Sequence, residues 1–273
     1  MKFSVLMSVY HKEKPIYLEK AFQSIVSQTY LPDEVVIVKD GELTQELDEL
    51  IDKYDFKKIK KKVVPLVSNQ GLGIALSIGL TKCSNEIIAR VDTDDVNLLN
   101  RFEIQIKEFH LNPELAIVGG QIAEFYEEKS IPIFISERKV PTTHQEIIKF
   151  SKTRNPFNHM TVMFKKSVIL ECGNYRNCPL CEDYDLWMRV LAQEYIVKNT
   201  PETLVHARTG LEMAERRGGA KYAHFMYQMR KSFYHSGYIS ISNFIVGTAA
   251  STIFALIPAT VRKKIYIGIL HKK

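Results

Sequence analysis

Three carboxylates stand within four residues of the chain, at Asp92, Asp94 and Asp95, directly after a strand-like run at 86–91. Carboxylates this close repel one another unless a positive charge neutralises them, and their oxygens suit hard cations such as Mg2+ or Mn2+. Mg2+ leaves part of its coordination shell to water or to substrate phosphates. The cluster therefore indicates a divalent metal that is shared with a phosphate-bearing substrate. The alternative is a solvated acidic turn that caps the next helix.

A second acidic pair, Glu182 and Asp183, opens a segment with helical spacing that also carries Trp187. A carboxylate within hydrogen-bond reach of a hydroxyl can remove its proton as a general base. Negative charge at a helix N-terminus also interacts favourably with the helix dipole. The pair therefore has a catalytic and a structural interpretation, and the two are compatible.

Arg216 and Arg217 precede two glycines, Gly218 and Gly219. A guanidinium can donate two parallel hydrogen bonds to a phosphate while it supplies positive charge. On a flexible loop, the two arginines would clamp a diphosphate as it gains charge during bond cleavage. The alternative is a solvated basic loop, or one that meets lipid headgroups.

The elements around these residues alternate between strand-like and helical patterns, which predicts an α/β fold with a mostly parallel sheet flanked by helices. The strand-like runs lie at 3–9, 34–38, 63–67 and 86–91. In open α/β sheets, ligands bind beyond the carboxyl ends of the strands. We therefore expect one crevice to gather the polar residues that follow these runs: Tyr10, Asp40, Asn69 and the aspartates at 92–95.

The C-terminal region differs from the rest, because 238–261 contains no charged residue and basic residues flank it. The stretch is long enough to span a bilayer, but its serines, threonines and proline weaken a transmembrane interpretation. Apolar burial together with basic flanks favours an amphipathic helix that lies on an anionic membrane. The alternative is a C-terminal helix buried in the core.

The composition and the N-terminus limit the kind of protein. The 273 residues carry a formal net charge of +6, which favours an acidic partner such as a phosphate, an anionic lipid or a nucleic acid. The first ten residues lack the basic leader, apolar region and cleavage site of a secretory signal. We therefore expect a cytoplasmic protein with reduced cysteines. No nucleic-acid-reading motif accompanies the charge, so we expect no nucleic-acid partner.

Five short motifs follow one another along the chain: Ser8-Val9-Tyr10, Val38-Lys39-Asp40-Gly41, Asn69-Gln70-Gly71-Leu72, Val91-Asp92-Thr93-Asp94-Asp95 and Glu182-Asp183-Tyr184-Asp185-Leu186-Trp187. In this order they resemble the family-two glycosyltransferases with the GT-A fold. The resemblance covers most of the chain, and the order of the motifs is far more specific than any single match. It implies inverting transfer of a sugar from a nucleotide diphosphate, as in bacterial capsule, O-antigen and exopolysaccharide sugar transferases.

The resemblance assigns the nucleotide-binding residues. Val9 and Tyr10 would lie beside the nucleobase, and Asp40 would meet the hydrogen-bonding edge of the base. Lys39 departs from the acidic residue that family members often carry before this aspartate, which leaves the contact to Asp40. Asn69 belongs to the same nucleotide-binding set.

The resemblance also assigns the metal and the reaction. Asp92 would bind ribose and, with Asp94, an Mn2+ or Mg2+ ion, and His206 would be a third metal ligand. Asp183 would be the catalytic base. The acceptor would contact three residues, which are His159, Glu182 and Trp187.

We therefore expect a glycosyltransferase domain at 1–220, with a nucleotide-sugar half at 1–120 and an acceptor half at 121–220, before a membrane-associating helical region at 221–273. The expected reaction moves a hexose from a UDP-linked donor to a polyprenyl-diphosphate-linked glycan at the inner face of the cell membrane. One rival is a sugar nucleotidyltransferase, although the chain lacks a glycine-rich basic phosphate loop near its N-terminus. The other is a noncatalytic lipid-binding or nucleic-acid-binding protein, which leaves the aspartate cluster unexplained.

Overall fold

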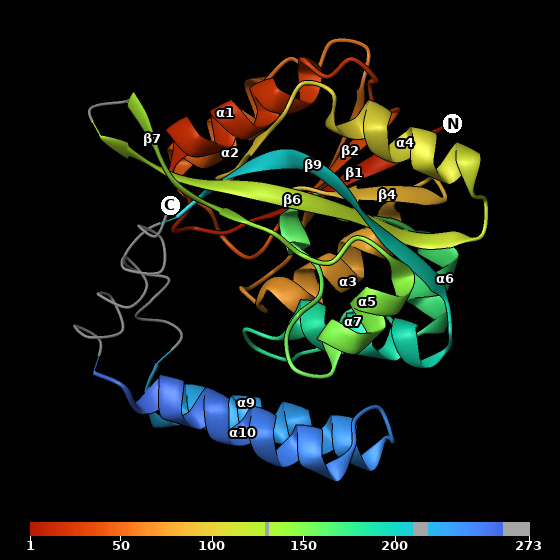
Figure 1. Cartoon of the computed structure of the whole chain (residues 1–273). Coiled ribbons are helices and arrows are strands. Elements are labelled where there is room, and N and C mark those ends of the chain that lie inside the picture. Colours follow the sequence, from red (N-terminus) through yellow and green to blue (C-terminus); the bar gives the residue numbers. More distant parts are fainter. Residues whose placement is uncertain (129–130, 210–217, 259–273) are drawn as a thin grey trace.

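The computed structural model describes residues 1–128, 131–209 and 218–258, and its centre is one twisted sheet with helices on both faces (Figure 1). The N-terminal part alternates strands and helices, as the sequence predicts. Its strands lie side by side in the order β3-β2-β1-β4, all parallel. The elements are β1 (Phe3–Val9), α1 (Pro15–Val26), β2 (Glu34–Lys39), α2 (Gln45–Lys53), β3 (Lys60–Pro65), α3 (Leu72–Lys82) and β4 (Ile87–Arg90).

The second part of the sheet is mixed: the strands from β3 to β4 are all parallel as expected, and beyond them parallel and antiparallel pairs both occur. β8 lies antiparallel between β4 and β6, whereas β9 runs parallel to β6. β5 and β7 add antiparallel partners to β9 and β6. The elements are β5 (Val96–Asn97), α4 (Arg101–Leu111), β6 (Leu115–Glu128), β7 (Ile131–Arg138), α5 (His144–Ser151), η1 (His159–Thr161), β8 (Met163–Lys165), α6 (Lys166–Glu171), α7 (Glu182–Ala192) and β9 (Ile196–Arg208).

Helices cover both faces of the sheet, with α1, α2 and α4 on one side and α3, α5, α6 and α7 on the other (Figure 1). Alternate residues of β1 serve the two layers: Phe3 and Met7 pack into the first core, and Leu6 packs into the second. Because both faces are covered, the central strands are mostly apolar on both sides rather than alternating. This is why the strand signal in the sequence is a continuous apolar run.

Two helices begin at threonines that the sequence places before helical spacing. Thr44 accepts a hydrogen bond from the backbone N–H of Leu47 at the start of α2. At α5, Thr143 and Glu146 form a capping box, in which the side chain of each accepts a hydrogen bond from the backbone N–H of the other. These contacts satisfy amides that have no partner within the helix. Side-chain caps of this kind fix where α2 and α5 begin.

A helical hairpin made of α9 (Gly219–His235) and α10 (Ile241–Leu256) completes the described chain and lies beside α7, away from the sheet (Figure 1). Met229 and Phe233 of α9 pack against α7. α10 lies lengthwise on α9 and forms the outermost layer. None of the described helices is both long and apolar enough to cross a bilayer. The predicted C-terminal helical region is therefore a hairpin in which α9 packs against the globular body.

Candidate active site

The end of β2 and the start of α3 form one side of the site. Asp40 is buried, and its carboxylate accepts hydrogen bonds from the backbone N–H groups of Gln70 (2.7 Å) and Gly71 (3.0 Å). The side-chain amide of Asn69 donates to the carbonyl of Asp40 (3.2 Å). The structure thus brings Asp40 and Asn69 together, as the sequence predicts. Each carboxylate oxygen of Asp40 retains a second lone pair with which it could accept a further hydrogen bond.

Gly41 makes this approach of two loops possible. Its φ is +84°, a conformation that strongly favours glycine, and an added Cβ would lie 2.5 Å from the backbone nitrogen of Asn69. No other residue fits there without moving the loop that carries Asn69. The glycine that follows Asp40 therefore fixes the geometry of this side of the site.

Val9 and Tyr10 differ in what they offer a ligand. Tyr10 is exposed on 37% of its surface, and its ring lies edge-on to that of His11 with 5.7 Å between ring centres. Val9 is completely buried, and its carbonyl accepts the backbone N–H of Asp40 (2.8 Å). Val9 therefore lies in the core and holds Asp40, and its contact with the nucleobase stays a prediction.

The acidic cluster follows β4, as expected, and two arginines hold it. Asp92 forms an ion pair with Arg90. Arg208 reaches the cluster from β9, because its backbone N–H donates to Asp95 Oδ1 (2.7 Å) and its Nε donates to the carbonyl of Asp94 (3.0 Å). Asp95 Oδ2 is buried and has no hydrogen-bond partner among the described residues. The carboxylates of the cluster are therefore fixed by the two arginines, and one buried oxygen lacks a hydrogen bond, which differs from a solvated turn.

Burial and mutual repulsion shift the protonation of this cluster. Burial, with repulsion from Glu13, raises the pKa of Asp94 above its ordinary value. Burial, with repulsion from Asp94, also raises the pKa of Asp95 well above its ordinary value. Carboxylates with raised pKa values favour a bound proton or a bound cation. The cluster is therefore poised to accept positive charge.

Two buried arginines lie beneath the cluster and were not singled out in the sequence. Arg90 and Arg101 are almost completely buried, and Arg101 donates to the carbonyl of Arg90 (2.8 Å). Burial, together with repulsion from Arg90, lowers the pKa of Arg101 to about 9. Arg90 also interacts electrostatically with Glu182, so it links the cluster with the second acidic pair. The sequence offered one sign of this role for Arg90, which is a charged residue inside an otherwise apolar strand.

The second acidic pair opens α7, as the sequence predicts. Burial, with repulsion from Asp183, raises the pKa of Glu182 to about 7. Asp183 accepts a hydrogen bond from the side-chain amide of Asn155 (2.6 Å), and its other oxygen accepts the backbone N–H of Tyr184 (2.7 Å). Asn155, which sequence reasoning missed, fixes the orientation of the carboxylate.

The N-termini of α3 and α7 pack closely, so the turn at Asp40 lies near the acidic pair of α7. Gly73 lies in the first turn of α3, and an added Cβ would approach the carbonyl oxygen of Arg176 and lie 3.1 Å from Cβ of Glu182. The turn held by Asp40 therefore lies directly beside the N-terminus of α7. Residues that are more than a hundred positions apart in sequence are neighbours here.

His159 and Trp187 lie behind the acidic pair. Nε2 of His159 is 3.1 Å from the hydroxyl of Tyr175, and burial, with repulsion from Arg90, holds the pKa of His159 well below its ordinary value. The imidazole is therefore neutral near pH 7. Trp187 is completely buried and packs against Phe157. The indole of Trp187 therefore lies in the core, whereas His159 is half-buried, and the acceptor contacts of both residues stay predictions.

His206 is the one predicted metal ligand that lies outside the acidic cluster among the residues that the structure describes. His206 lies opposite Val96 in β9, and its ring packs on Phe134 with 4.6 Å between ring centres. Burial lowers the pKa of His206. Within the described ranges, no three His, Cys, Asp or Glu side chains form a group that could hold a metal ion. Arg216 and Arg217 lie outside the described residues.

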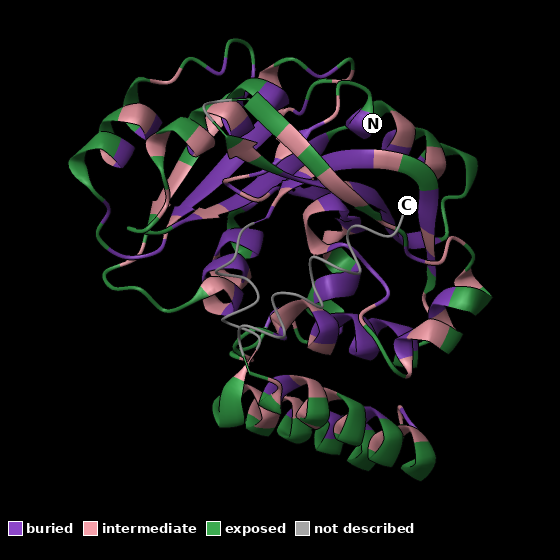
Figure 2. Cartoon of the chain, turned by 60° about the vertical axis from the view of Figure 1, so that its left-hand side comes forward, coloured by how far each residue is buried: buried purple, intermediate pink, exposed green. Residues whose placement is uncertain are grey.

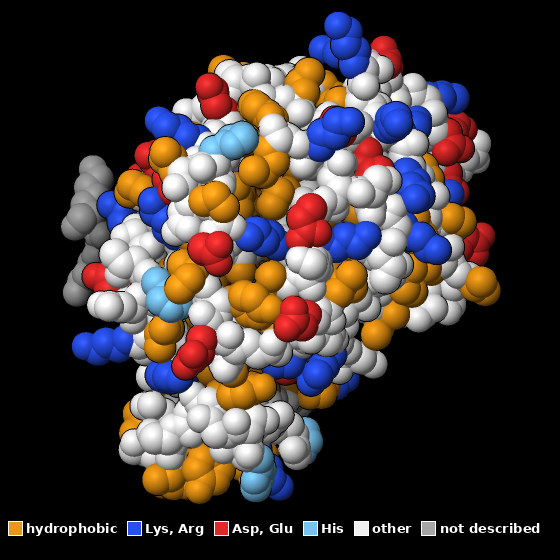
Figure 3. Space-filling view, turned by 90° about the vertical axis from the view of Figure 1, so that its right-hand side faces the viewer, with side chains coloured by type: hydrophobic (Ala, Val, Ile, Leu, Met, Phe, Trp, Pro, Cys, Tyr) orange, Lys and Arg blue, Asp and Glu red, His pale blue; other side chains and the backbone are white. Residues whose placement is uncertain are grey.

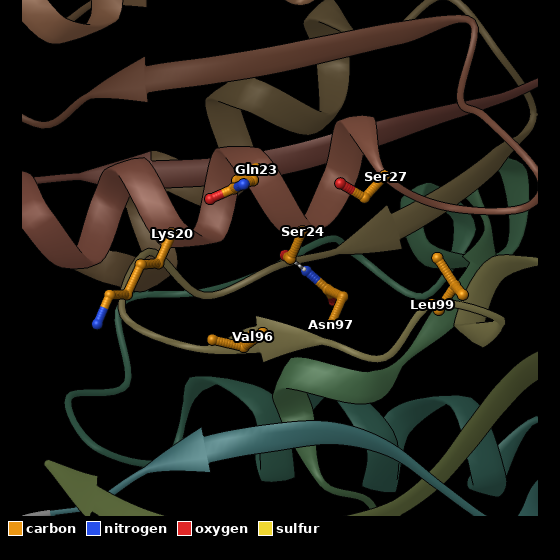
Figure 4. Close-up of a pocket in the computed structure, with 7 residues that line it drawn as sticks. All are labelled: Lys20, Gln23, Ser24, Ser27, Val96, Asn97 and Leu99. Carbon is orange, nitrogen blue, oxygen red and sulfur yellow. Dashed lines mark hydrogen bonds between the residues drawn. The ribbon is translucent and has the colours of Figure 1, made fainter. Parts of the chain in front are cut away.

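A shallow hollow of about 340 Å³ lies elsewhere, between α1 and β5 (Figure 4). In it, the side-chain amide of Asn97 donates to the hydroxyl of Ser24 (2.8 Å). The hollow contains none of the predicted site residues. Its lining is made of Lys20, Gln23, Ser24, Ser27, Val96, Asn97 and Leu99.

The sequence of the chain carries a family signature across this site. Residues 4–170 match the family model described as Glycosyl transferase family 2. The chain belongs to this family. The match spans β1 to α6 and thus includes the Asp40 turn and the acidic cluster, while the α7 acidic pair follows it. Membership sets aside the two rival interpretations, a nucleotidyltransferase and a noncatalytic binding protein.

Full-length relatives agree with the family. An uncharacterized glycosyltransferase of Haemophilus influenzae is 42% identical over 272 residues, which are 100% of each chain. The UDP-Gal:alpha-D-GlcNAc-diphosphoundecaprenol beta-1,3-galactosyltransferase of Escherichia coli is 39% identical over 271 residues, covering 99% of this glycosyltransferase and 97% of its relative. The similarity therefore extends through the C-terminal hairpin.

Solved structures confirm the expected GT-A type of α/β fold. The mannosyltransferase PcManGT from Pyrobaculum calidifontis, in complex with GDP-Man and Mn2+, matches with a TM-score of 0.65 at 13% identity, covering 98% of this chain and 73% of that one. S. aureus TarS in complex with UDP-GlcNAc matches with a TM-score of 0.61 at 18% identity, covering 84% and 66%. At these identities, the likeness concerns the fold of this glycosyltransferase alone.

Proposed function

We propose that this glycosyltransferase is a metal-dependent, inverting hexosyltransferase that moves a hexose from a UDP-linked donor to a polyprenyl-diphosphate-linked glycan in bacterial surface polysaccharide synthesis. The observation that carries the proposal is the meeting of two acidic groups around one buried guanidinium. Asp92 pairs with Arg90, and Glu182 interacts with the same arginine. One group suits a metal-bound donor and the other suits an acceptor hydroxyl.

The aspartate cluster fits a divalent cation. Asp95 has a buried carboxylate oxygen without a partner among the described residues, and the pKa of Asp94 is raised by burial. A divalent cation held by Asp92 and Asp94 would satisfy this negative charge in place of a proton. With few protein ligands, the rest of its coordination shell would be left to phosphate oxygens and water. The bound ion would supply Lewis-acid stabilisation of the departing diphosphate.

The donor nucleotide fits the side of the site formed by the strand ends. The exposed ring of Tyr10 suits stacking on a base, while Asp40 and Asn69 supply hydrogen-bonding groups next to it. The E. coli relative is named for UDP-Gal, which supports a UDP-linked hexose. Arg216 and Arg217 remain the proposed contacts to the diphosphate.

Asp183 is the proposed base. Its carboxylate would accept the proton of the acceptor hydroxyl while that oxygen attacks the anomeric carbon and the bond to the nucleoside diphosphate breaks. A single displacement of this kind inverts the anomeric centre. Asn155 holds the carboxylate by a 2.6 Å hydrogen bond and leaves lone pairs for the acceptor. Glu182 and His159 would contact the acceptor sugar.

The acceptor of the E. coli relative, by its name, is a GlcNAc-diphosphoundecaprenol. This supports a lipid-linked acceptor here and a peripheral position on the inner face of the cell membrane. The test is a panel of UDP-hexoses incubated with Mn2+ and a diphospholipid-linked GlcNAc, with the product anomer read by NMR. Transfer with inversion is the expected result, whereas retention of configuration, or transfer undiminished by a chelator, would overturn the mechanism.

A further inference from the structure

The outward face of α10 is apolar and covered by nothing in the described structure. The helix contains no charged residue, and five of its large hydrophobic side chains are exposed on at least half of their surface. Figure 2 shows the outer side of the hairpin as mostly exposed, and Figure 3 shows hydrophobic side chains gathered at the corresponding lower end of the molecule. The five are Ile241, Ile245, Val246, Ile253 and Leu256.

Charge in this part of the chain has one sign only. Residues 218–273 contain eight of the 37 Lys and Arg and none of the 31 Asp and Glu, so they account for more than the whole net charge of +6. Within the described hairpin, Lys221 and Lys231 are exposed and no carboxylate is present, so a second copy of the chain would bring like charge without a partner for it, which opposes self-association. Apolar side chains within a purely basic segment match the acyl region and headgroups of an anionic bilayer.

α9, the inner helix of the hairpin, packs on α7, which carries the acidic pair. Phe233 of α9 contacts the ring of Tyr184 with 5.3 Å between ring centres, and Met226 lies against Cys181. Cys181 and Tyr184 immediately flank Glu182 and Asp183 in the sequence. The hairpin thus rests on the first turn of α7.

The hairpin also holds the loop that orients Asp183. Arg230 of α9 donates to the carbonyl of Thr153 (2.7 Å), and Lys152 donates to the carbonyl of Tyr238 in the hairpin turn (2.7 Å). The same loop, two residues further on, carries Asn155, whose amide donates to Asp183. Contacts from the hairpin therefore reach both the first turn of α7, which carries Asp183, and the loop that carries Asn155.

We propose that the outward face of α10 docks on an anionic lipid bilayer, and that the hairpin thereby sets the position of the Asn155–Asp183 pair relative to the lipid surface. The inference rests on the proposed function, because a lipid-linked acceptor presents its sugar at that surface. Docking confines enzyme and acceptor to one plane and fixes their relative orientation, which raises the frequency of productive encounters.

The test compares two double variants of the full chain that add the same charge. Ile245→Glu with Ile253→Glu places two carboxylates on the α10 face, whereas Leu111→Glu with Leu170→Glu places them on exposed positions of α4 and α6. Each is floated with vesicles of equal parts phosphatidylethanolamine and phosphatidylglycerol, and with vesicles of phosphatidylcholine alone. Circular dichroism and the melting temperature check that both variants remain folded.

We expect the α10 variant to lose at least about tenfold in partitioning onto the anionic vesicles, while the control pair binds as the unaltered chain does. Transfer to a diphospholipid-linked acceptor embedded in those vesicles should fall in parallel, and transfer to a short-chain acceptor in solution should not. Equal partitioning of the two variants would overturn the proposal. So would a dimer of the unaltered chain that the α10 substitutions dissociate. Absence of sugar transfer in every assay would instead count against the proposed function, because vesicle binding is measured without any substrate.

Discussion

Replacement of Asp183 by Asn tests the proposed catalytic base most directly. The amide keeps the shape of the side chain but cannot take up the proton of the acceptor hydroxyl. General-base catalysis commonly contributes ~10²–10⁴-fold to a rate, which corresponds to about 2.7–5.4 kcal/mol of barrier. We expect single-turnover transfer at saturating donor to fall by this factor, with donor affinity unchanged.

The effect of Asp183→Asn on stability follows from its hydrogen bonds. The new carbonyl can accept from Asn155 in place of Asp183 Oδ2, but the NH2 group then faces the N–H of Tyr184 and loses that bond. One such bond contributes ~1 kcal/mol, and the loss is opposed by relief of the repulsion that raises the pKa of Glu182. The melting temperature should therefore shift by no more than about 4 °C.

Asp185→Asn is the matched control, because the same substitution is made two residues further along α7. Asp185 forms an ion pair with Arg189 (2.7 Å), whose side chain is almost completely buried. We expect this variant to lose stability and to keep its rate per folded molecule. Stopped-flow quench with a radiolabelled donor gives the rates, and calorimetry gives the melting temperatures. A nearly normal rate in Asp183→Asn, with a large loss in Asp185→Asn, would refute the assignment of the base.

Further outcomes can be stated for the metal, the core and the turn at Asp40. Asp94→Ala should abolish Mn2+-dependent donor binding in titration calorimetry, and unchanged affinity would remove the metal assignment. Asp94 and Glu182, whose pKa values are raised, keep a proton in the metal-free native state that they lose earlier in the unfolded chain, so their contribution to stability decreases as pH rises from about 4 to 7. Across this window the melting temperature of the metal-free chain should fall relative to that of an Asp94→Asn, Glu182→Gln double variant, whose amides do not titrate, and it should recover with Mn2+ at neutral pH; a constant difference would contradict the shifts. Trp187→Phe should cost about 1–3 kcal/mol in chemical denaturation and leave the acceptor KM unchanged, whereas a raised KM would place Trp187 in the acceptor site. Gly41→Ala should destabilise the fold by about 1–3 kcal/mol and weaken nucleotide binding, since the added Cβ meets the backbone of Asn69, and normal binding would mean that this loop moves freely.

The sequence by itself determined the N-terminal half of the fold and the order of its chemical groups. Apolar runs at β1, β2 and β4 and the helical spacing between them are local signals, and the chirality and adjacency of β-α-β units then place their carboxyl ends at one edge. The acidic cluster and the acidic pair were found for the same reason, since a few adjacent residues carry the whole pattern.

Only the tertiary structure decided how the second half is arranged, because its contacts join residues that are far apart in the chain. β6 pairs with β9 across some eighty residues, and this pairing brings Arg208 to the aspartate cluster. The fully buried environment of Trp187 and the bond from Asn155 to Asp183 likewise depend on which helix faces meet. The types and spacing of side chains in the sequence indicate which chemistry is possible. Long-range packing determines which of those side chains lie close enough to act together.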